Sequence, residues 1–283
     1  MAGRVGARPG WVREGKGMLF FLTGDVQIGK TRWLDRTIGE LARAGVPSAG
    51  VLAPGVWCER AEGEGAPASA AAGAGRYEKL GIDNVLLPQG ERVAFARRRD
   101  LAVREGSYRP GSQSAAAQLV WEIDDAAIAR VNAHFDRLAA GVGDGGNLVV
   151  AAGAQGGGEG AGACGRVLAP AGAVHGGDSA AAAGAAFNGE APPPAAAPAA
   201  RGGLLVVDEL GQLELLRGGG LSSAVALLQA GPSARFPHAV AVVRDWLLEQ
   251  ADGLFAEAWP ERASIAPGGD ARRALRTAFG LGA

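Results

Sequence analysis

The fold of this chain is decided by the stretch Gly24-Asp25-Val26-Gln27-Ile28-Gly29-Lys30-Thr31. It matches the phosphate-binding loop pattern G-x-x-x-x-G-K-[ST] at every fixed position. An apolar run at residues 18–22 precedes it, and a segment with helical periodicity follows it. This order predicts a buried strand, a loop whose backbone N–H groups converge on phosphate oxygens, and a helix whose positive end faces the same anion. We therefore expect all eight residues to contact a nucleotide.

Two side chains of the loop have distinct expected roles. Lys30 would reach the outer phosphates as a mobile positive charge, and Thr31 would offer its hydroxyl to a magnesium ion. The competing explanation is a chance match in a chain with 47 glycines. The order of strand, loop, Lys-Thr pair and helix argues against chance.

Length and composition narrow the class of protein. The 283 residues allow one large domain or two small ones, and 20% are charged with a formal net charge of -1. Because no global basic field exists, we expect no nucleic-acid partner. No apolar run is long enough for a membrane span, and residues 1–17 resemble a flexible leader rather than a secretory signal. Two distant cysteines, Cys58 and Cys164, predict neither a disulfide framework nor a zinc site, so we expect a cytoplasmic protein.

Hydrophobic periodicity predicts the elements that follow the loop. A helix is expected over 31–44 and a second strand over 48–53, a βαβ start that implies a parallel sheet. Residues 59–75 are expected to form a surface loop, and 76–92 a β-hairpin or a pair of short strands broken at Gly81.

Residues from 97 to 141 predict further elements and candidate sites. Residues 119–121 are expected to be an edge strand, and Asp124 or Asp125 to cap a helix that ends near Gly141. His134 on this helix is expected to be partly exposed, without a metal. The basic run Arg97-Arg98-Arg99 is either a solvated face or a phosphate clamp, and the sequence leaves this open.

Residues 151–201 form an Ala/Gly/Pro-rich tract with few large apolar side chains. Such a tract buries too little area to offset its ordering entropy, so we expect a disordered insertion. Residues 147–150 resemble the start of a strand. The expected organisation is a leader at 1–17 and a single domain at 18–283, interrupted by the insertion.

A second landmark follows the insertion. Residues 204–207 are four aliphatic residues, and Asp208 and Glu209 follow them directly. This pattern predicts a buried parallel strand that presents carboxylates at its carboxyl end. Asp208 is expected to hold magnesium opposite Thr31, and Glu209 to orient and deprotonate an attacking water. Beyond them we expect the three elements 222–228 (helix), 239–243 (strand) and 270–279 (helix). Arg244 follows that strand and either reaches the γ-phosphate or Glu209, or pairs with Asp245 or Glu249.

The segment 207–215, V-D-E-L-G-Q-L-E-L, resembles the D-E-[IL]-G-x-[ML]-E-L signature of a small P-loop nucleoside-triphosphatase family that includes the human cancer-related nucleoside-triphosphatase. The loop at 23–31, the Gly90-Glu91-Arg92 turn and Ala96-Arg97-Arg98 are similar in order. The resemblance implies a compact three-layer α/β domain, a RecA-like P-loop NTPase with a mostly parallel sheet and an appended β-hairpin. It also implies Mg²⁺-dependent hydrolysis of several nucleoside triphosphates, with Lys30 and Glu209 catalytic, Thr31 and Asp208 on the metal, and Glu214 structural.

The chain departs from the family pattern in its insertion and in Leu213, where methionine is common. Two other readings stay open: a nucleoside or nucleotide kinase on the same core, and a non-enzymatic nucleotide-dependent switch or accessory protein. Base preference, oligomeric state and pathway are not readable from these residues.

Overall fold

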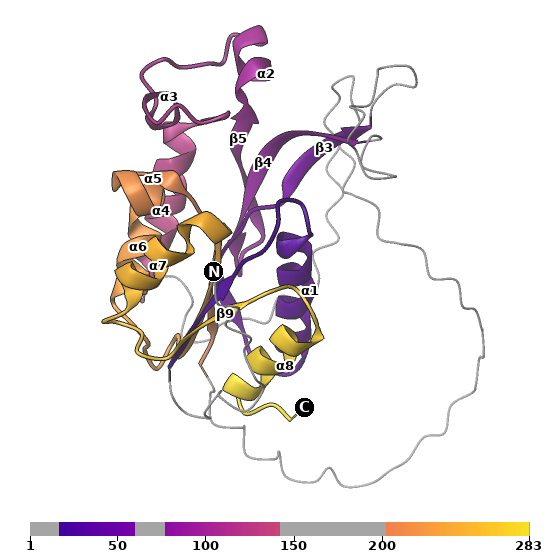
Figure 1. The fold of residues 1–283 in the computed structure, drawn as a ribbon, viewed down its shortest axis with the longest axis vertical. Coiled ribbons are helices and arrows are strands. Elements are labelled where there is room, and N and C mark those ends of the chain that lie inside the picture. The colour runs from indigo at the N-terminus through magenta and orange to yellow at the C-terminus, as the bar shows by residue number, and fades with distance from the viewer. Residues whose placement is uncertain (1–16, 60–76, 142–201, 283) are drawn as a thin grey trace, which may run out of the picture.

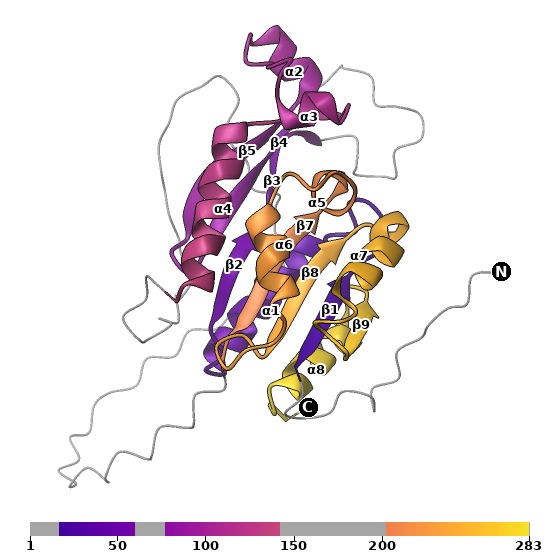
Figure 2. The ribbon, with the colours of Figure 1, turned by 90° about the vertical axis from the view of Figure 1, so that its left-hand side faces the viewer.

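The computed structural model describes residues 17–59, 77–141 and 202–282. These residues form an α/β fold around one mixed sheet with helices on both faces (Figures 1 and 2). The leader, the expected loop at 59–75 beyond Glu59, the expected strand at 147–150 and the insertion at 151–201 all lie outside the described residues.

One half of the sheet is parallel. Its strands, in spatial order, are β2 (Ser48–Leu52), β7 (Leu204–Leu210), β8 (His238–Val243), β1 (Met18–Leu22) and β9 (Arg262–Ile265). Nearly every residue of β1, β2, β7 and β8 is buried, because helices cover both faces and a continuous apolar run is then favoured over alternation. The sequence predicted these four strands within about a residue at their starts.

The other half is antiparallel. It consists of β4 (Tyr77–Leu87), which pairs with β2, and then β5 (Glu91–Arg98), β6 (Trp121–Ile123) and β3 (Gly55–Glu59), which pairs with β4. The sheet is therefore mixed, and the expectation of a mostly parallel sheet holds only for the half that carries the loop and the acids.

The predicted hairpin exists with different limits. Gly81 does not break the strand but lies inside β4, where a Cβ would come 2.6 Å from the carbonyl oxygen of Ala96 on β5. Glycine is there because the neighbouring backbone approaches closely. The turn between β4 and β5 falls at residues 88–90.

Helices form an outer layer on each face. On one face, α1 (Lys30–Arg43) and α8 (Gly269–Ala278) pack through Leu34 and Leu275 against the even-numbered side chains of β1, such as Phe20. On the other face, Phe21 contacts the core formed with α4 (Asp125–Ala139), α5 (Gln212–Arg217), α6 (Ser222–Gln229) and α7 (Leu248–Phe255). Alternate residues of one strand thus serve two cores, which is the three-layer arrangement (Figure 2).

Short elements complete the described chain. They are α2 (Arg99–Arg104) and α3 (Gln113–Ala116), at the end of the molecule beyond β5 (Figure 1), and the 3₁₀ turn η1 (Asp245–Leu247). The sequence did not predict α2, α3, α5, β3 or β9.

Two expectations about single residues were wrong. His134 is 2% exposed, because α4 turns it toward β2, where its Nε2 lies 3.1 Å from the carbonyl oxygen of Gly50. Cys58 is disulfide-bonded, which removes the cysteine argument for a reducing compartment. No helix among the described residues has the length and apolar character needed to cross a membrane.

Candidate nucleotide site

The loop between β1 and α1 has the backbone needed to surround an anion. Gly24, Gln27 and Gly29 have positive φ values of 120°, 66° and 91°, which let the chain turn tightly at this point. The helix α1 starts at Lys30 with Gly29 as its N-cap, and no side chain of the described residues caps it. Its first N–H groups are therefore free to bind an anion.

The Lys30 ammonium lies over this loop. Its Nζ donates to the carbonyl oxygens of Gly24 at 2.6 Å and Asp25 at 2.9 Å. These carbonyl oxygens hold the ammonium against the loop, and its contact with the outer phosphates of a nucleotide stays a prediction.

The carboxylate of Asp208 reaches the same helix start from β7. It is 3% exposed and accepts the N–H of Ala53 at 2.9 Å, and the Thr31 hydroxyl acts to lower its pKa. Burial raises the pKa of Asp208 to about 6, against the lowering effect of the Ala53 N–H. The fold thus brings together the two residues predicted to hold magnesium, one from α1 and the other from β7.

A hydroxyl and a carboxylate are hard oxygen ligands that suit Mg²⁺, which takes one or two protein oxygens and fills its other positions with phosphate oxygens and water. The described residues contain no cluster of three or more His, Cys, Asp or Glu that could hold a metal unaided. Thr31 and Asp208 fit a metal that arrives with a phosphate ligand.

Glu209 follows Asp208 with a strained backbone. Its φ is +74°, unusual for a residue with a side chain, and the pairing of β7 with β8 is irregular between Val207 and Leu210. A bulge at this point re-aims side chains at the end of a strand. Asp208 can therefore stay buried while Glu209, its neighbour, has a side chain that is 33% exposed.

Two charged residues follow the carboxyl end of β8, and each contacts a different neighbouring strand end. Arg244 Nη2 donates to Glu209 Oε1 at 2.8 Å, on the side of β7. Asp245 accepts the Gly24 N–H at 2.8 Å and the Thr23 hydroxyl, on the side of β1. The Thr23 hydrogen bond lowers the pKa of Asp245. Of the alternatives for Arg244, the one the structure contains is the contact with Glu209.

Lys79 is a charged residue near the acids that the sequence did not single out. It lies on β4 with its Nζ 5.1 Å from the centre of the Trp121 ring. Burial lowers its pKa most, and the charges of Glu209, Arg244 and Asp208 also act on it. No sequence feature distinguishes Lys79 from the other polar residues of its predicted strand segment.

Glu214 has the structural role that the resemblance implied. Its carboxylate accepts the N–H groups of Gly211 at 2.8 Å and Leu221 at 2.9 Å, so it closes the turn that follows β7. A Cβ at Gly220 would collide with this carboxylate. Burial raises the pKa of Glu214.

The basic run at 97–99 has local partners. Arg97 is bidentate to Glu105, Arg98 pairs with Glu78 and Asp100, and Arg99 donates to the carbonyl oxygen of Ser114. These local contacts favour the solvated face, the other alternative, over a phosphate clamp.

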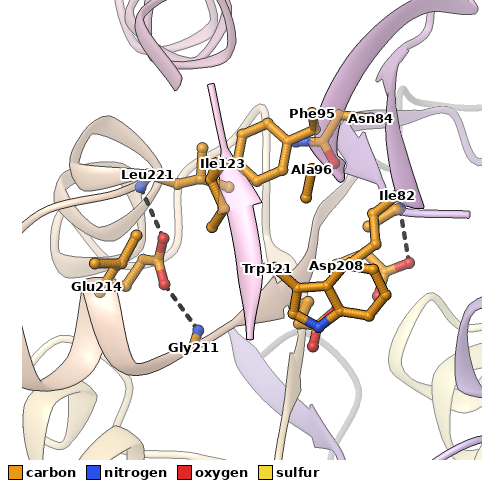
Figure 3. A pocket seen from close by; sticks show the side chains of 13 residues that line it. Ile82, Asn84, Phe95, Ala96, Trp121, Ile123, Asp208, Gly211, Glu214 and Leu221 are labelled. Atoms are coloured by element: carbon orange, nitrogen blue, oxygen red, sulfur yellow. Dashed lines mark hydrogen bonds between the residues drawn. The ribbon is translucent and has the colours of Figure 1, made fainter. Parts of the chain in front are cut away.

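A pocket lies beside the acids, and Asp208 is one of its lining residues (Figure 3). Its walls come from β4, β5, β6, the end of β7 and the segment 211–221, and include Asn84, Phe95, Trp121, Ile123 and Asp208. The pocket is small, with a cavity volume of about 80 Å³, and it opens to solvent.

Comparison with known proteins adds no family to this geometry. A scan against models of protein families, a search of curated proteins and a search of solved structures each returned no match.

Proposed function

We propose that the protein is a magnesium-dependent nucleoside-triphosphatase with a RecA-like P-loop fold, which hydrolyses ATP, GTP and other nucleoside triphosphates to the diphosphate and phosphate. One observation carries the proposal. Thr31 at the start of α1 lies near the Asp208 carboxylate, whose pKa its hydroxyl acts to lower, and Glu209 stands next in the chain with its carboxylate partly open to solvent.

The order of the strands supports this reading. β8 lies between β1, which leads into the loop, and β7, which carries the acids. Open α/β sheets bind ligands outside the carboxyl ends of their parallel strands. The loop after β1, Asp208 and Glu209 on β7, and Arg244 after β8 all lie at this edge.

Each residue of the site has a separate role in hydrolysis. The loop N–H groups and Lys30 bind the phosphates, and Thr31 with Asp208 would hold Mg²⁺, which supplies positive charge to the phosphate oxygens when bound. Glu209 accepts a proton from the attacking water. The water oxygen forms a bond to the γ-phosphorus, and the bond from that phosphorus to the bridging oxygen breaks. The diphosphate leaves with the electrons of that bond. Arg244 positions the Glu209 carboxylate and adds positive charge beside the reacting phosphate.

A nucleoside or nucleotide kinase is the second candidate, because the same loop and acids would bind the triphosphate of such an enzyme. The test is phosphate release from ATP, GTP, CTP, UTP and deoxynucleotides, with and without Mg²⁺ and with and without free nucleosides. Mg²⁺-dependent release without an acceptor supports the hydrolase. Diphosphate formed only with an acceptor, and without free phosphate, supports the kinase. Binding without turnover contradicts both.

A further inference from the structure

The Asp245 side chain is exposed, yet its hydrogen-bond partners lie at the start of the phosphate-binding loop. One of its oxygens, Oδ1, accepts both the N–H of Gly24 at 2.8 Å and the hydroxyl of Thr23, the residue before the loop. Among the described residues, no other hydrogen bond or ion pair involves this carboxylate. Because exposed polar side chains contribute little to global stability, these contacts act mainly on the conformation of the loop.

Gly24 is held by charged side chains on both sides of its Cα. Its N–H donates to Asp245, and its carbonyl oxygen accepts the Lys30 ammonium at 2.6 Å. The turn itself depends on glycine, since φ is +120° and an added Cβ would come 2.7 Å from the Ile28 side chain. The first turn of the loop is therefore fixed by one carboxylate and one ammonium.

A bound nucleotide would act differently on these two contacts. Lys30 is the residue proposed to bind the outer phosphates, and an ammonium that turns to phosphate oxygens gives up its contact with a carbonyl oxygen. The Thr23 hydrogen bond lowers the pKa of Asp245, so this carboxylate is ionised and has no proton to donate to a phosphate. The contact of Asp245 with the Gly24 N–H is the one that can stay in place when the phosphates are bound.

We propose that Asp245 is a positioning residue of the nucleotide site, which anchors the first turn of the loop to the end of β8 while Lys30 binds the phosphates. The inference rests on the proposed function only in that the loop binds a triphosphate, and it does not depend on hydrolysis. Arg244, the preceding residue, holds Glu209 from the same strand end. Two adjacent residues after β8 thus link the loop after β1 to the candidate base on β7.

The test compares two neutral side chains of similar volume, Asp245→Asn and Asp245→Leu. Because a single oxygen accepts both hydrogen bonds, the carbonyl oxygen of asparagine can replace it, whereas leucine offers no acceptor. Asp245→Ala also lacks the acceptor and is the second variant if Asp245→Leu does not fold. Glu257→Leu, at an exposed carboxylate after α7, is the matched control.

Two quantities are measured on the full chain. They are hydrogen exchange of the amides at 23–31 without nucleotide, and the calorimetric affinity for non-hydrolysable analogues of ATP and GTP with Mg²⁺. In Asp245→Leu and Asp245→Ala we expect exchange at least about tenfold faster and affinity at least about tenfold lower, since hydrogen bonds to a charged group are lost. Asp245→Asn keeps the acceptor and should stay within about threefold of the wild type in both measurements, as should Glu257→Leu.

Wild-type exchange or wild-type affinity in Asp245→Leu and Asp245→Ala would overturn the inference and leave the proposed function standing. Equal losses in Asp245→Asn and Asp245→Leu would overturn it too, because the charge and not the hydrogen bonds would then be responsible. Absence of triphosphate binding by the wild type would overturn the inference together with the proposed function.

Discussion

Arg244 Nη2 lies 2.8 Å from Glu209 Oε1, so the residue after β8 holds the carboxylate that follows β7. Their side chains are 42% and 33% exposed. An ion pair this open to water contributes only about 0–1 kcal/mol to stability. The ion pair matters for the site instead of for stability, because Arg244 fixes the direction of the Glu209 carboxylate beside Asp208.

Arg244→Met should therefore separate turnover from stability. We expect the rate of Mg²⁺-dependent phosphate release to fall at least about tenfold, because the positioning contact and a positive charge are both lost. The free energy of unfolding should change by less than about 1 kcal/mol. Phosphate release and urea denaturation measure the two effects. A large loss of stability with unchanged turnover would assign Arg244 a structural role instead.

Lys30→Ala should weaken binding of the Mg²⁺-triphosphate complex at least about tenfold, since a hydrogen bond to a charged group contributes roughly 1.5–3 kcal/mol. Arg43→Ala is the control, because Arg43 is an exposed cation at the opposite end of α1. Calorimetric titration with a non-hydrolysable triphosphate measures both variants. Equal affinity for Lys30→Ala and Arg43→Ala would remove the loop from nucleotide binding.

His134 should make stability depend on pH. Burial lowers its pKa in the folded state, so the folded protein favours the neutral ring and the unfolded chain binds the proton more readily. Its contribution to stability is present above the unfolded pKa of about 6.5 and is lost as pH falls below it. Asp208, with its pKa raised to about 6, acts in the opposite direction. The effect of His134 is therefore measured as the difference in pH dependence between the wild type and a variant that lacks the imidazole.

His134→Gln provides that difference, since glutamine can donate to the Gly50 carbonyl oxygen and does not titrate. We expect the urea midpoint of the wild type to drop more between pH 7.5 and 5.5 than that of the variant. His238, whose pKa burial also lowers, remains in both proteins. Identical pH dependence in the two proteins would show that His134 does not titrate in this way.

Deletion of residues 151–201 should leave the described fold intact. The helix α4 and the start of β7, on either side of the insertion, are both tied to Arg235. Its Nη1 donates to the Leu138 carbonyl oxygen at 3.0 Å, and its own carbonyl oxygen accepts the Gly203 N–H at 2.7 Å. Because the chain leaves and returns near one residue, residues 142–150 can serve as the connection.

The melting temperature of the deletion variant should change by less than about 3 °C, which is roughly 1 kcal/mol for a domain of this size. Both proteins are measured under reducing conditions, because Cys58 is disulfide-bonded and the deletion removes Cys164, the other cysteine of the chain. A collapse of the transition would contradict the prediction of a disordered insertion that contributes little core.

The parts of the fold that were predictable are those whose signal is local. The loop is specified by fixed positions in eight consecutive residues, and the runs at 204–207 and 239–243 are apolar because both of their faces are covered. By contrast, β9 has the sequence Arg-Ala-Ser-Ile, which carries no strand pattern. It is a strand because β1 lies beside it with backbone groups to pair.

The parts of the site that were missed depend on distant contacts. Arg244 was expected to pair within its own segment or to reach the site, and only the position of β8 beside β7 decides between them. Lys79 and Asn84 belong to a strand segment in which nothing marks them as different from other polar residues. The mixed sheet brings them to the acids, since β4 pairs with β2 and β2 pairs with β7.

The most direct test of the account is the comparison of Glu209→Gln with Glu249→Gln, an exposed position on α7 where the same charge is removed. Triphosphate binding and phosphate release are measured on the same samples with Mg²⁺. The account predicts that Glu209→Gln binds the triphosphate almost as well as the wild type while releasing phosphate at least about 10²-fold more slowly, the usual size of a general-base effect. Glu249→Gln should behave as the wild type does. Phosphate release by Glu209→Gln at the wild-type rate would contradict the account.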